Sequence, residues 1–300
     1  MTIKFQESRD VMKNKKFYLY TAVIFSLLVI SGCGTTPQAA PGLFRYSPEP
    51  TPEYCMLYKG ANRFKLHPDR QYAVFNNIPI QLPVATYYGK KCVYSPIPVV
   101  QSNIIDPLMN DFIPFRSIKR ILLDPGHGAH DSGAAGKISR EKNLNLLLAL
   151  EIRKALLKEG FQVVMTRSND SFLPLPNRVA LVKKHNADLF ISIHHNSSKT
   201  NPQAAGIECF ARRFPRPEDT VLAVLIQKEL IRYTGSTNRG VKFANFAVLR
   251  NNPVPAVLIE AGFISNPQEE KLLVTARRHR EAAQAVAAAV SRFAALAKRN

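Results

Sequence analysis

Residues 118–160 read IKRILLDPGHGAHDSGAAGKISREKNLNLLLALEIRKALLKEG, and this stretch decides the fold. An apolar strand is expected over Arg120 to Leu123, and a Gly-rich turn follows it. From Glu141 to Lys158, leucine, isoleucine and alanine recur at helical spacing, and Gly160 ends the helix. A strand, a turn and a helix in this order are typical of sheets whose strands are joined by covering helices.

The same alternation continues to the end of the chain. Further strands are expected at 162–166, 189–193, 207–210 and 256–259, and further helices at 176–185, 218–233, 267–275 and 280–297. Residues 118–300 are therefore predicted to form one α/β domain, a mostly parallel twisted sheet flanked by helices on both faces.

The first 32 residues have the features of an export signal. A basic segment at 12–16 precedes a largely apolar stretch of 14 residues at 17–30, shorter than the ~20 residues needed to cross a bilayer as a helix. The Ile-Ser-Gly before Cys33 resembles the lipobox of bacterial lipoproteins, which implies cleavage before Cys33 and a lipid on its sulfur. An ordinary signal peptide followed by a chance cysteine is the alternative.

These features predict an envelope protein held to a membrane through the lipid on Cys33 and facing the periplasm or wall. Gly34 is compatible with sorting to an outer membrane. Met12 begins a shorter signal than Met1 and is an alternative start. Residues 33–53 contain five prolines among small and polar residues, a composition that favours an extended tether.

Residues 54–117 are predicted to form a separate, small β-rich domain. Alternating runs between Asn, Gly and Pro indicate hairpin strands at 71–75, 78–82 and 91–94. The stretch is weakly similar to the β-rich stalk repeats named after copper amine oxidase N-terminal domains, which implies a spacer or wall-binding role. In an oxidising envelope Cys55 and Cys92 either form a disulfide, worth about 3–4 kcal/mol, or remain two free thiols.

The chain is strongly basic, with a formal net charge of +19. Residues 1–32 carry five basic and two acidic residues, so the remainder keeps +16. Such an excess favours polyanionic surroundings, which for an exported chain are anionic lipids and wall polymers rather than nucleic acid. A generally basic surface without a dedicated ligand is the alternative.

Four polar residues lie where a predicted strand ends or a helix begins, which is where open α/β sheets build their sites. His127 lies in the turn after the first strand, Glu141 opens the next helix, and His194 and Glu260 end two apolar strands. Two imidazoles and a carboxylate suit one zinc ion, because three protein ligands leave an open position for water. A second carboxylate can take the proton of that water. We therefore assign His127, Glu141 and His194 to one Zn²⁺, and Glu260 to general base and acid.

Four short motifs follow one another in this region: DPGHG at 124–128, REKN at 140–143, SIHHN at 192–196 and EAGFISNP at 260–267. In this order they resemble the signatures of zinc-dependent N-acetylmuramoyl-L-alanine amidases (Amidase_3). The resemblance covers nearly all of 118–296. It implies cleavage of the amide that joins N-acetylmuramic acid to L-alanine of the stem peptide in peptidoglycan.

Each assignment has a structural alternative. His127 is otherwise a turn residue, Glu141 a helix-start residue favoured by the macrodipole, and Glu260 a buried, paired carboxylate. Strand alternation lets only one of His194 and His195 face the site easily, and the family pattern selects His194. The family usually has a small residue at position 195, so a swapped ligand stays open.

Several neighbouring residues have expected supporting roles. Asn196, Arg239 and Lys242 are expected to meet glycan or peptide carboxylates, with solvated loop residues as the alternative. Arg167 and Arg178 are expected to brace the structure. His130 and Asp131 either support the metal loop or form a surface turn.

Two other functions stay open. A zinc carboxypeptidase acting on the stem peptide would use the same kind of site, and a non-catalytic wall-binding lipoprotein would lack one of the four site residues. Some amidases of this family insert a long segment whose helix covers the zinc until an activator removes it. Here the 45 residues from 196 to 240 are used up by one strand, one helix and turns. We therefore expect an uncovered site and no obligatory activator.

Overall fold

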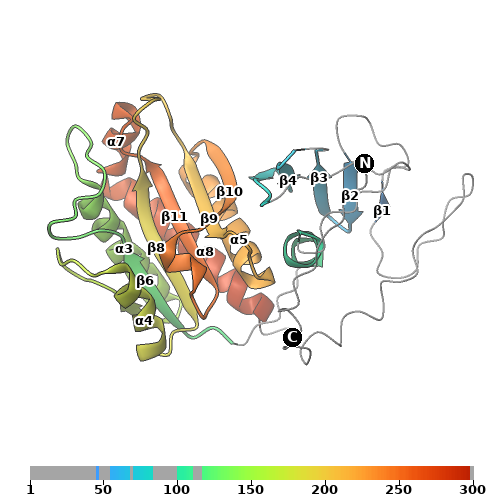
Figure 1. Cartoon of the computed structure of the whole chain (residues 1–300), viewed down its shortest axis with the longest axis horizontal. Coiled ribbons are helices and arrows are strands. Elements are labelled where there is room, and N and C mark those ends of the chain that lie inside the picture. Colours follow the sequence, from blue (N-terminus) through green and yellow to red (C-terminus); the bar gives the residue numbers. More distant parts are fainter. Residues whose placement is uncertain (1–44, 47–54, 68–69, 84–99, 111–116, 298–300) are drawn as a thin grey trace, which may run out of the picture. The chain divides into compact units, whose positions relative to one another are not determined.

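A computed structural model describes residues 45–46, 55–67, 70–83, 100–110 and 117–297 (Figure 1). The strands among these residues form one sheet of 11 strands, in the order β1-β2-β3-β4-β5-β10-β9-β11-β8-β6-β7. The predicted signal and Cys33 lie outside the described residues. Within the part of the chain that is described, no helix is long and apolar enough to span a membrane.

Six of the strands form the sheet predicted for the C-terminal region. They are β6 (Arg120–Pro125), β7 (Gln162–Met165), β8 (Leu189–Asn196), β9 (Ile207–Arg212), β10 (Asn238–Ala244) and β11 (Ala256–Phe263). Neighbouring strands run parallel except β9 and β11, which are antiparallel. The sheet is therefore mostly parallel, as predicted.

Helices cover both faces of these six strands (Figure 1). They are α3 (Glu141–Lys158), α4 (Leu175–Lys184), α5 (Pro217–Thr234), α6 (Ala247–Arg250), α7 (Pro267–Leu273) and α8 (Ala276–Ala297). Helices α3, α5 and α8 pack on the face that buries Leu123 and Ile191. Helices α4 and α6 pack on the opposite face, which buries Leu122 and Phe190. Alternate residues of each strand thus enter two separate cores, and the predicted α/β class is confirmed.

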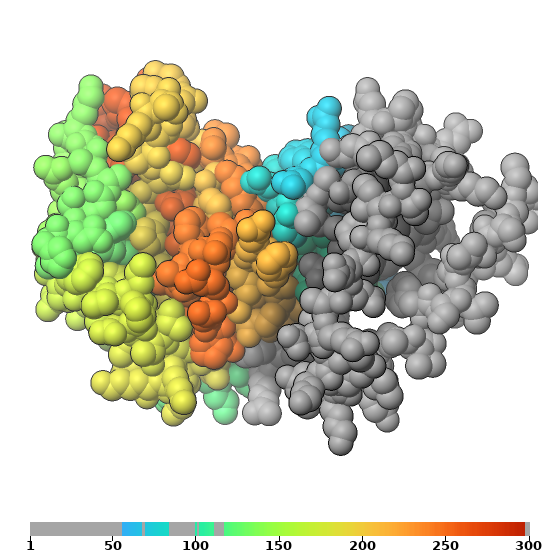
Figure 2. All heavy atoms as spheres, viewed as in Figure 1, coloured from blue at the N-terminus to red at the C-terminus, as the bar shows by residue number. Residues whose placement is uncertain are grey.

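The face covered by α4 and α6 is the one that carries the candidate site. His194 and Glu260 are an even number of residues from Phe190 and Leu258, so their side chains point to the same face as these two core residues. In Figure 2 the yellow-green atoms of α4 and the orange atoms around α6 lie on the face toward the viewer, and the red atoms of α8 are largely hidden.

Most elements agree with the sequence prediction, and helix α3 has the predicted bounds. Strand β10, helix α6 and the helical segment η1–α2 (Gln101–Ile105 and Asp106–Asn110) were not predicted. Strand β10 begins Asn-Arg-Gly, and its register to β9 shifts between Asn238 and Val241. A polar start and a bulge remove the alternation by which a strand is normally detected.

The N-terminal strands continue the six-stranded sheet. Strands β1 (Arg45–Tyr46), β2 (Cys55–Lys59), β3 (Asn62–Leu66), β4 (Ala73–Phe75) and β5 (Ile78–Ile80) are joined in antiparallel succession. Strand β5 then pairs in parallel with β10, and the Gln81 amide donates to the Val241 carbonyl at 2.8 Å. The hairpin strands predicted within 71–75 and 78–82 are confirmed as β4 and β5. The strand predicted at 91–94, Cys92 and the side chain of Cys55 lie outside the described residues, so the disulfide stays a prediction.

One glycine makes this junction possible. Gly240 has φ +80°, and a Cβ atom there would lie 2.2 Å from the Pro79 carbonyl oxygen. Any side chain at this position would push β5 away from β10 at the edge of the six-stranded sheet. The apolar residues of β2 to β5 and of η1–α2, among them Phe64, Ile80 and Ile104, belong to the same buried cluster as the core beneath α5.

Candidate metal centre

Three of the four predicted site residues meet at one point. His127 follows β6, Glu141 is the first residue of α3, and His194 lies on β8. One potential ligand atom from each lies within 4.8 Å of the other two. Glu141 Oε1 lies 3.2 Å from His127 Nε2 and 2.9 Å from His194 Nδ1. Two imidazole nitrogens converging on one carboxylate oxygen are a donor set that suits zinc.

The loop after β6 holds His127 in an unusual backbone conformation. His127 has φ +62°, and its Nδ1 lies 2.8 Å from Asp131 Oδ2, so Nε2 is left facing Glu141. The preceding Gly126 is packed under the ring of His194, because a Cβ there would lie 2.2 Å from His194 Cε1. A carboxylate on the far nitrogen of a histidine fixes the ring and its tautomer. Asp131 therefore orients His127, one of the two roles expected for it.

Two buried arginines donate hydrogen bonds to backbone carbonyls of the same loop. Arg178 donates from Nη1 to Asp124 Oδ1 at 2.8 Å and from Nη2 to the His127 carbonyl at 2.9 Å. Arg167 donates from Nη2 to the Gly126 carbonyl at 2.8 Å. Both side chains therefore brace the loop, as expected. His130 instead packs its ring on Phe172, with centroids 4.3 Å apart.

Glu141 is tied into the loop as well as into the cluster. Its Oε2 accepts the Ala134 amide at 2.8 Å, and its Oε1 accepts the His195 amide at 3.3 Å. Burial opposes ionisation of Glu141, but the hydrogen bonds and charges of His127 and His194 outweigh it and hold its pKa far below the ordinary value. Burial opposes protonation of His127, but the hydrogen bonds and charges of Glu141 and Asp131 outweigh it and raise the pKa of His127. The cluster is therefore arranged around a carboxylate anion.

His195 lies on the other side of β8. Its ring is buried, with Nδ1 2.8 Å from Asn145 Oδ1 of α3, and burial lowers its pKa to about 3. Among the described residues, the cluster that could hold a metal contains His194 and not His195. Strand alternation accounts for this arrangement, because consecutive side chains point to opposite faces.

Glu260 stands beside His194 on the neighbouring strand. It is in register with His194 of β8 on one side and with Glu208 of β9 on the other. Its Oε2 is buried and has no hydrogen-bond partner among the described residues. Burial, followed by repulsion from Glu141 and Glu208, raises the pKa of Glu260 well above 4.5, against the attraction of Lys242. A carboxylate with raised proton affinity and a free oxygen has the properties of a general base.

The three residues predicted to contact substrate share a partner that was not predicted. Glu208 Oε1 accepts from Asn196 Nδ2 at 2.8 Å, while Oε2 accepts from Arg239 Nε at 2.8 Å and from Lys242 Nζ at 2.5 Å. Glu208 is 3% exposed. A glutamate between Ile207 and Cys209 in an apolar strand was the available signal, because a charge at such a position needs a partner.

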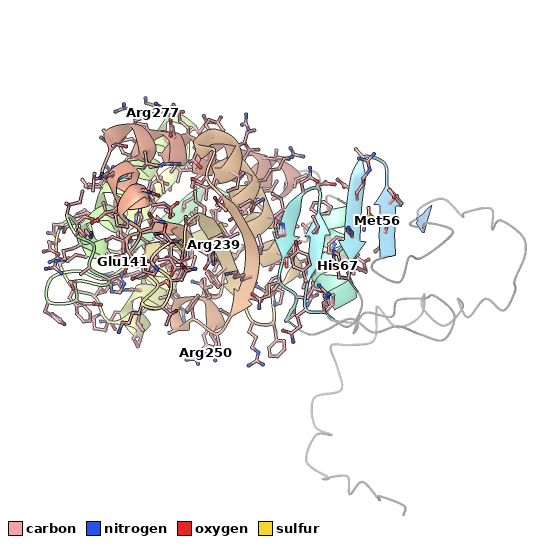
Figure 3. The ribbon with its side chains drawn as sticks, turned by 90° about the horizontal axis from the view of Figure 1, so that it is seen from above. Met56, His67, Glu141, Arg239, Arg250 and Arg277 are labelled. Carbon is pink, nitrogen blue, oxygen red and sulfur yellow. The ribbon has the colours of Figure 1, made fainter. Side chains whose placement is uncertain are left out.

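These side chains form a row across the sheet. By strand order it runs from Arg239 and Lys242 on β10 through Glu208 on β9 and Glu260 on β11 to His194 on β8. Figure 3 labels Arg239 at one end of this row and Glu141 of the ligand cluster at the other.

An α/β fold with a His-Glu-His donor set and a separate carboxylate at the strand ends could hold a metal ion beside a proton acceptor. Comparison with known proteins gives the family. A model of the N-acetylmuramoyl-L-alanine amidase family matches residues 121–292, and the chain belongs to this family. The enzyme class predicted from the four motifs is thereby confirmed.

Relatives in two groups of bacteria show this similarity. The amidase AmiA of Escherichia coli (strain K12) is 36% identical over 215 residues, covering 57% of this chain and 74% of AmiA. The amidase LytC of Bacillus subtilis (strain 168) is 34% identical over 189 residues, covering 63% of this chain and 37% of LytC. An amidase structure from Clostridium difficile 630 has a TM-score of 0.57 at 34% identity and covers 58% of this chain and 96% of that one.

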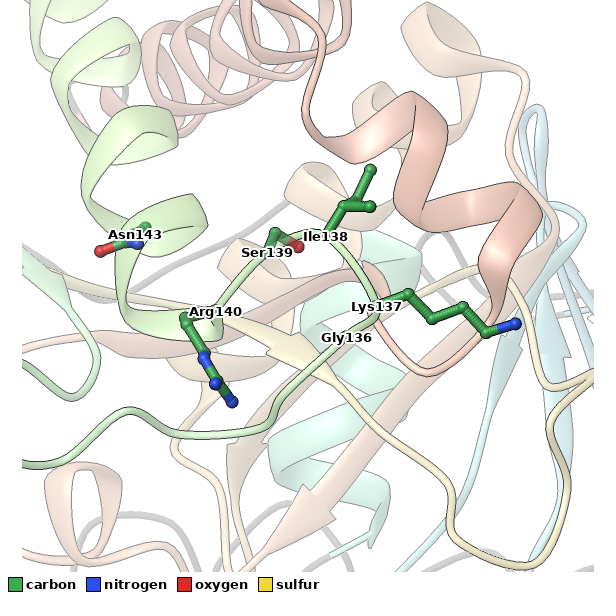
Figure 4. Close-up of a pocket in the computed structure, with 6 residues that line it drawn as sticks. All are labelled: Gly136, Lys137, Ile138, Ser139, Arg140 and Asn143. Carbon is green, nitrogen blue, oxygen red and sulfur yellow. The ribbon is translucent and has the colours of Figure 1, made fainter.

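A second carboxylate anchors the loop that leads into Glu141. Glu270 of α7 accepts the amides of Lys137, Ile138 and Ser139, each at 2.9 Å, and the Ser139 hydroxyl at 2.7 Å. Residues 136–140, with Asn143, line a shallow pocket at this loop (Figure 4). Burial opposes ionisation of Glu270, but these hydrogen bonds lower its pKa below 4.5. Sequence reasoning did not identify this residue.

We predict that Glu270→Gln lowers the free energy of unfolding by about 1–3 kcal/mol at pH 7, because three backbone amides and one hydroxyl lose a charged acceptor. Since the folded pKa lies below 4.5, the stabilisation is present above that pH and is lost as pH falls through the folded pKa. The variant should therefore lose less stability than the wild type between neutral and acid pH. Urea unfolding at several pH values measures both effects.

The control for this prediction is Glu281→Gln, which breaks an exposed ion pair with Arg277. It should change stability by less than about 0.5 kcal/mol. Identical pH dependence of stability in the wild type and the Glu270 variant would contradict the role given to Glu270.

Proposed function

We propose that this chain hydrolyses the amide bond between N-acetylmuramic acid and L-alanine of the stem peptide, with one zinc ion held by His127, Glu141 and His194. The observation that carries the proposal is the donor cluster lying beside Glu260, whose buried Oε2 has no hydrogen-bond partner among the described residues. Relatives named as N-acetylmuramoyl-L-alanine amidases and cell wall amidases support peptidoglycan as the substrate.

The residues divide the chemistry between them. When bound, a zinc ion with three protein ligands offers an open position where water is acidified to a pKa of about 7. Glu260 accepts a proton from the attacking water as its oxygen bonds to the amide carbon. As the carbon–nitrogen bond breaks, Glu260 passes that proton to the leaving nitrogen of L-alanine. Asp131 keeps Nε2 of His127 directed at the site throughout.

Asn196, Arg239 and Lys242 are proposed to contact the substrate next to this centre. Two cations share the single charge of Glu208, so one positive charge is left at this edge of the site. The Arg239 and Lys242 side chains remain 34% and 24% exposed. Carboxylates of the stem peptide are the matching groups.

We further propose that the site needs no activator. Between β8 and β10 the chain forms only β9 and α5, and α5 packs against α8 on the opposite face of the sheet. The alignment with AmiA spans 215 residues, whereas 57% of this 300-residue chain is about 171 residues, so AmiA has residues within the alignment that lack a counterpart in this chain.

A lipid on Cys33 would hold the enzyme at a membrane of the cell envelope, with residues 33–53 as the tether. The proposal rests on the signal-like residues before Cys33 and on the basic composition. Mass spectrometry of the mature N-terminus should show an acylated Cys33 as the first residue. A mature chain that begins after Cys33 without a lipid would exclude this anchor.

We predict that the purified, lipid-free protein releases intact stem peptides that begin with L-alanine from peptidoglycan, without any partner protein. A zinc chelator should abolish the release, and added zinc should restore it. Mass analysis of the soluble fragments measures this outcome. Release of single D-amino acids would indicate a carboxypeptidase instead, and no release in the presence of zinc would contradict hydrolytic function.

The matched variant is Glu260→Ala. It should lower kcat by at least about 100-fold while zinc content stays at one ion per chain, because the base is lost and the ligands remain. Glu281→Ala, on the surface of α8, should keep the wild-type rate. Full activity of the Glu260 variant would remove this residue from the mechanism.

A further inference from the structure

Glu208 and Glu260 lie in register on adjacent strands and face the same side of the sheet, but they differ in their hydrogen-bond partners. Glu208 of β9 receives hydrogen bonds from three side chains, two of them cationic. Glu260 of β11 has a buried Oε2 with no partner among the described residues. Buried carboxylates normally find hydrogen-bond donors, so the unequal division of donors between these neighbours needs a cause.

The strand order supplies that cause. Strand β9 lies between β10, which carries Arg239 and Lys242, and β11, which carries Glu260. Because β9 separates β10 from β11, both cations bind Glu208. Both donate hydrogen bonds to the same oxygen, Oε2. Arg239 is further fixed over the ring of Phe263, with its guanidinium carbon 4.7 Å from the ring centroid. Lys242 has a flexible chain and already attracts Glu260 electrostatically.

We propose that Glu208 is a positioning residue that holds Lys242 away from the catalytic base, while Arg239 stays fixed over Phe263. An ammonium group bound to Glu260 would occupy the oxygen that must accept the water proton. Glu208 prevents this by binding the Lys242 ammonium itself. This role of Glu208 depends on the proposed function of Glu260 as the general base. Glu208 keeps the Glu260 oxygen free to accept the proton.

The bond to Asn196 gives Glu208 its fixed position. Asn196 lies at the end of β8, two residues after His194, and donates to Glu208 Oε1. The carboxylate is therefore tied to β8 through one oxygen and to β10 through the other. Its orientation does not depend on the cations alone, so it can hold them when substrate enters.

The test compares Glu208→Gln, Lys242→Met and the double variant by steady-state kinetics on soluble peptidoglycan fragments. Glu208→Gln releases Lys242 to Glu260 and should lower kcat by at least about tenfold. Lys242→Met should act mainly on KM, through the lost substrate contact. In the double variant no ammonium competes for Glu260, so kcat should return to within about threefold of Lys242→Met.

Controls separate this mechanism from simple damage. Glu229→Gln breaks a buried glutamate's ion pair with Arg232 on α5 and should leave kcat unchanged. Zinc content and thermal unfolding are measured for every variant. If Glu208→Gln fails to fold, the double variant still tests the idea, because it removes both members of the Glu208–Lys242 pair together.

A Glu208→Gln variant with the wild-type kcat would overturn the proposal. A double variant as slow as Glu208→Gln would overturn it too, since Glu208 would then act by some route other than Lys242. An inactive wild type would instead contradict the proposed function, and the two failures are therefore distinguishable.

Discussion

The Glu141 carboxylate, held between the His127 and His194 rings, is the interaction on which the rest of the site depends. It joins three separate parts of the fold: the loop after β6, the start of α3 and the end of β8. Each part is fixed by the core or by buried polar contacts, α3 through its apolar face and the loop through Arg167, Arg178 and Glu270. The donors are therefore preorganised, which is what a three-ligand metal site requires.

Three carboxylates follow one another across the sheet from this cluster, and each has different partners. Glu141 is stabilised as an anion by imidazoles, Glu260 lacks a hydrogen bond to Oε2 among the described residues, and Glu208 is bound to two cations. Three carboxylates in one small region would repel one another strongly if their surroundings were alike. Different partners let each take a different role, so the proposed ligand, base and positioning group can coexist.

Much of this arrangement could be predicted from the sequence, because it depends on local pattern. The bounds of α3, the alternation along β8 and the strand ends carrying His194 and Glu260 are all short-range features. Strand β10 and its junction with β5 depend on a bulge and on one glycine against Pro79, contacts between distant segments. Glu208 was missed for the same reason, since its partners come from β8 and β10. Pairings between separate strands are not expressed in local periodicity.

The central claim is that His127, Glu141 and His194 hold one metal ion beside Glu260. Anomalous diffraction at the zinc edge, from crystals of the zinc-loaded protein, tests it most directly. The account predicts a single peak at about 2.0–2.2 Å from a nitrogen of each histidine and from a Glu141 carboxylate oxygen. A peak at His195, or none at the cluster in a protein that contains one zinc per chain, would contradict it.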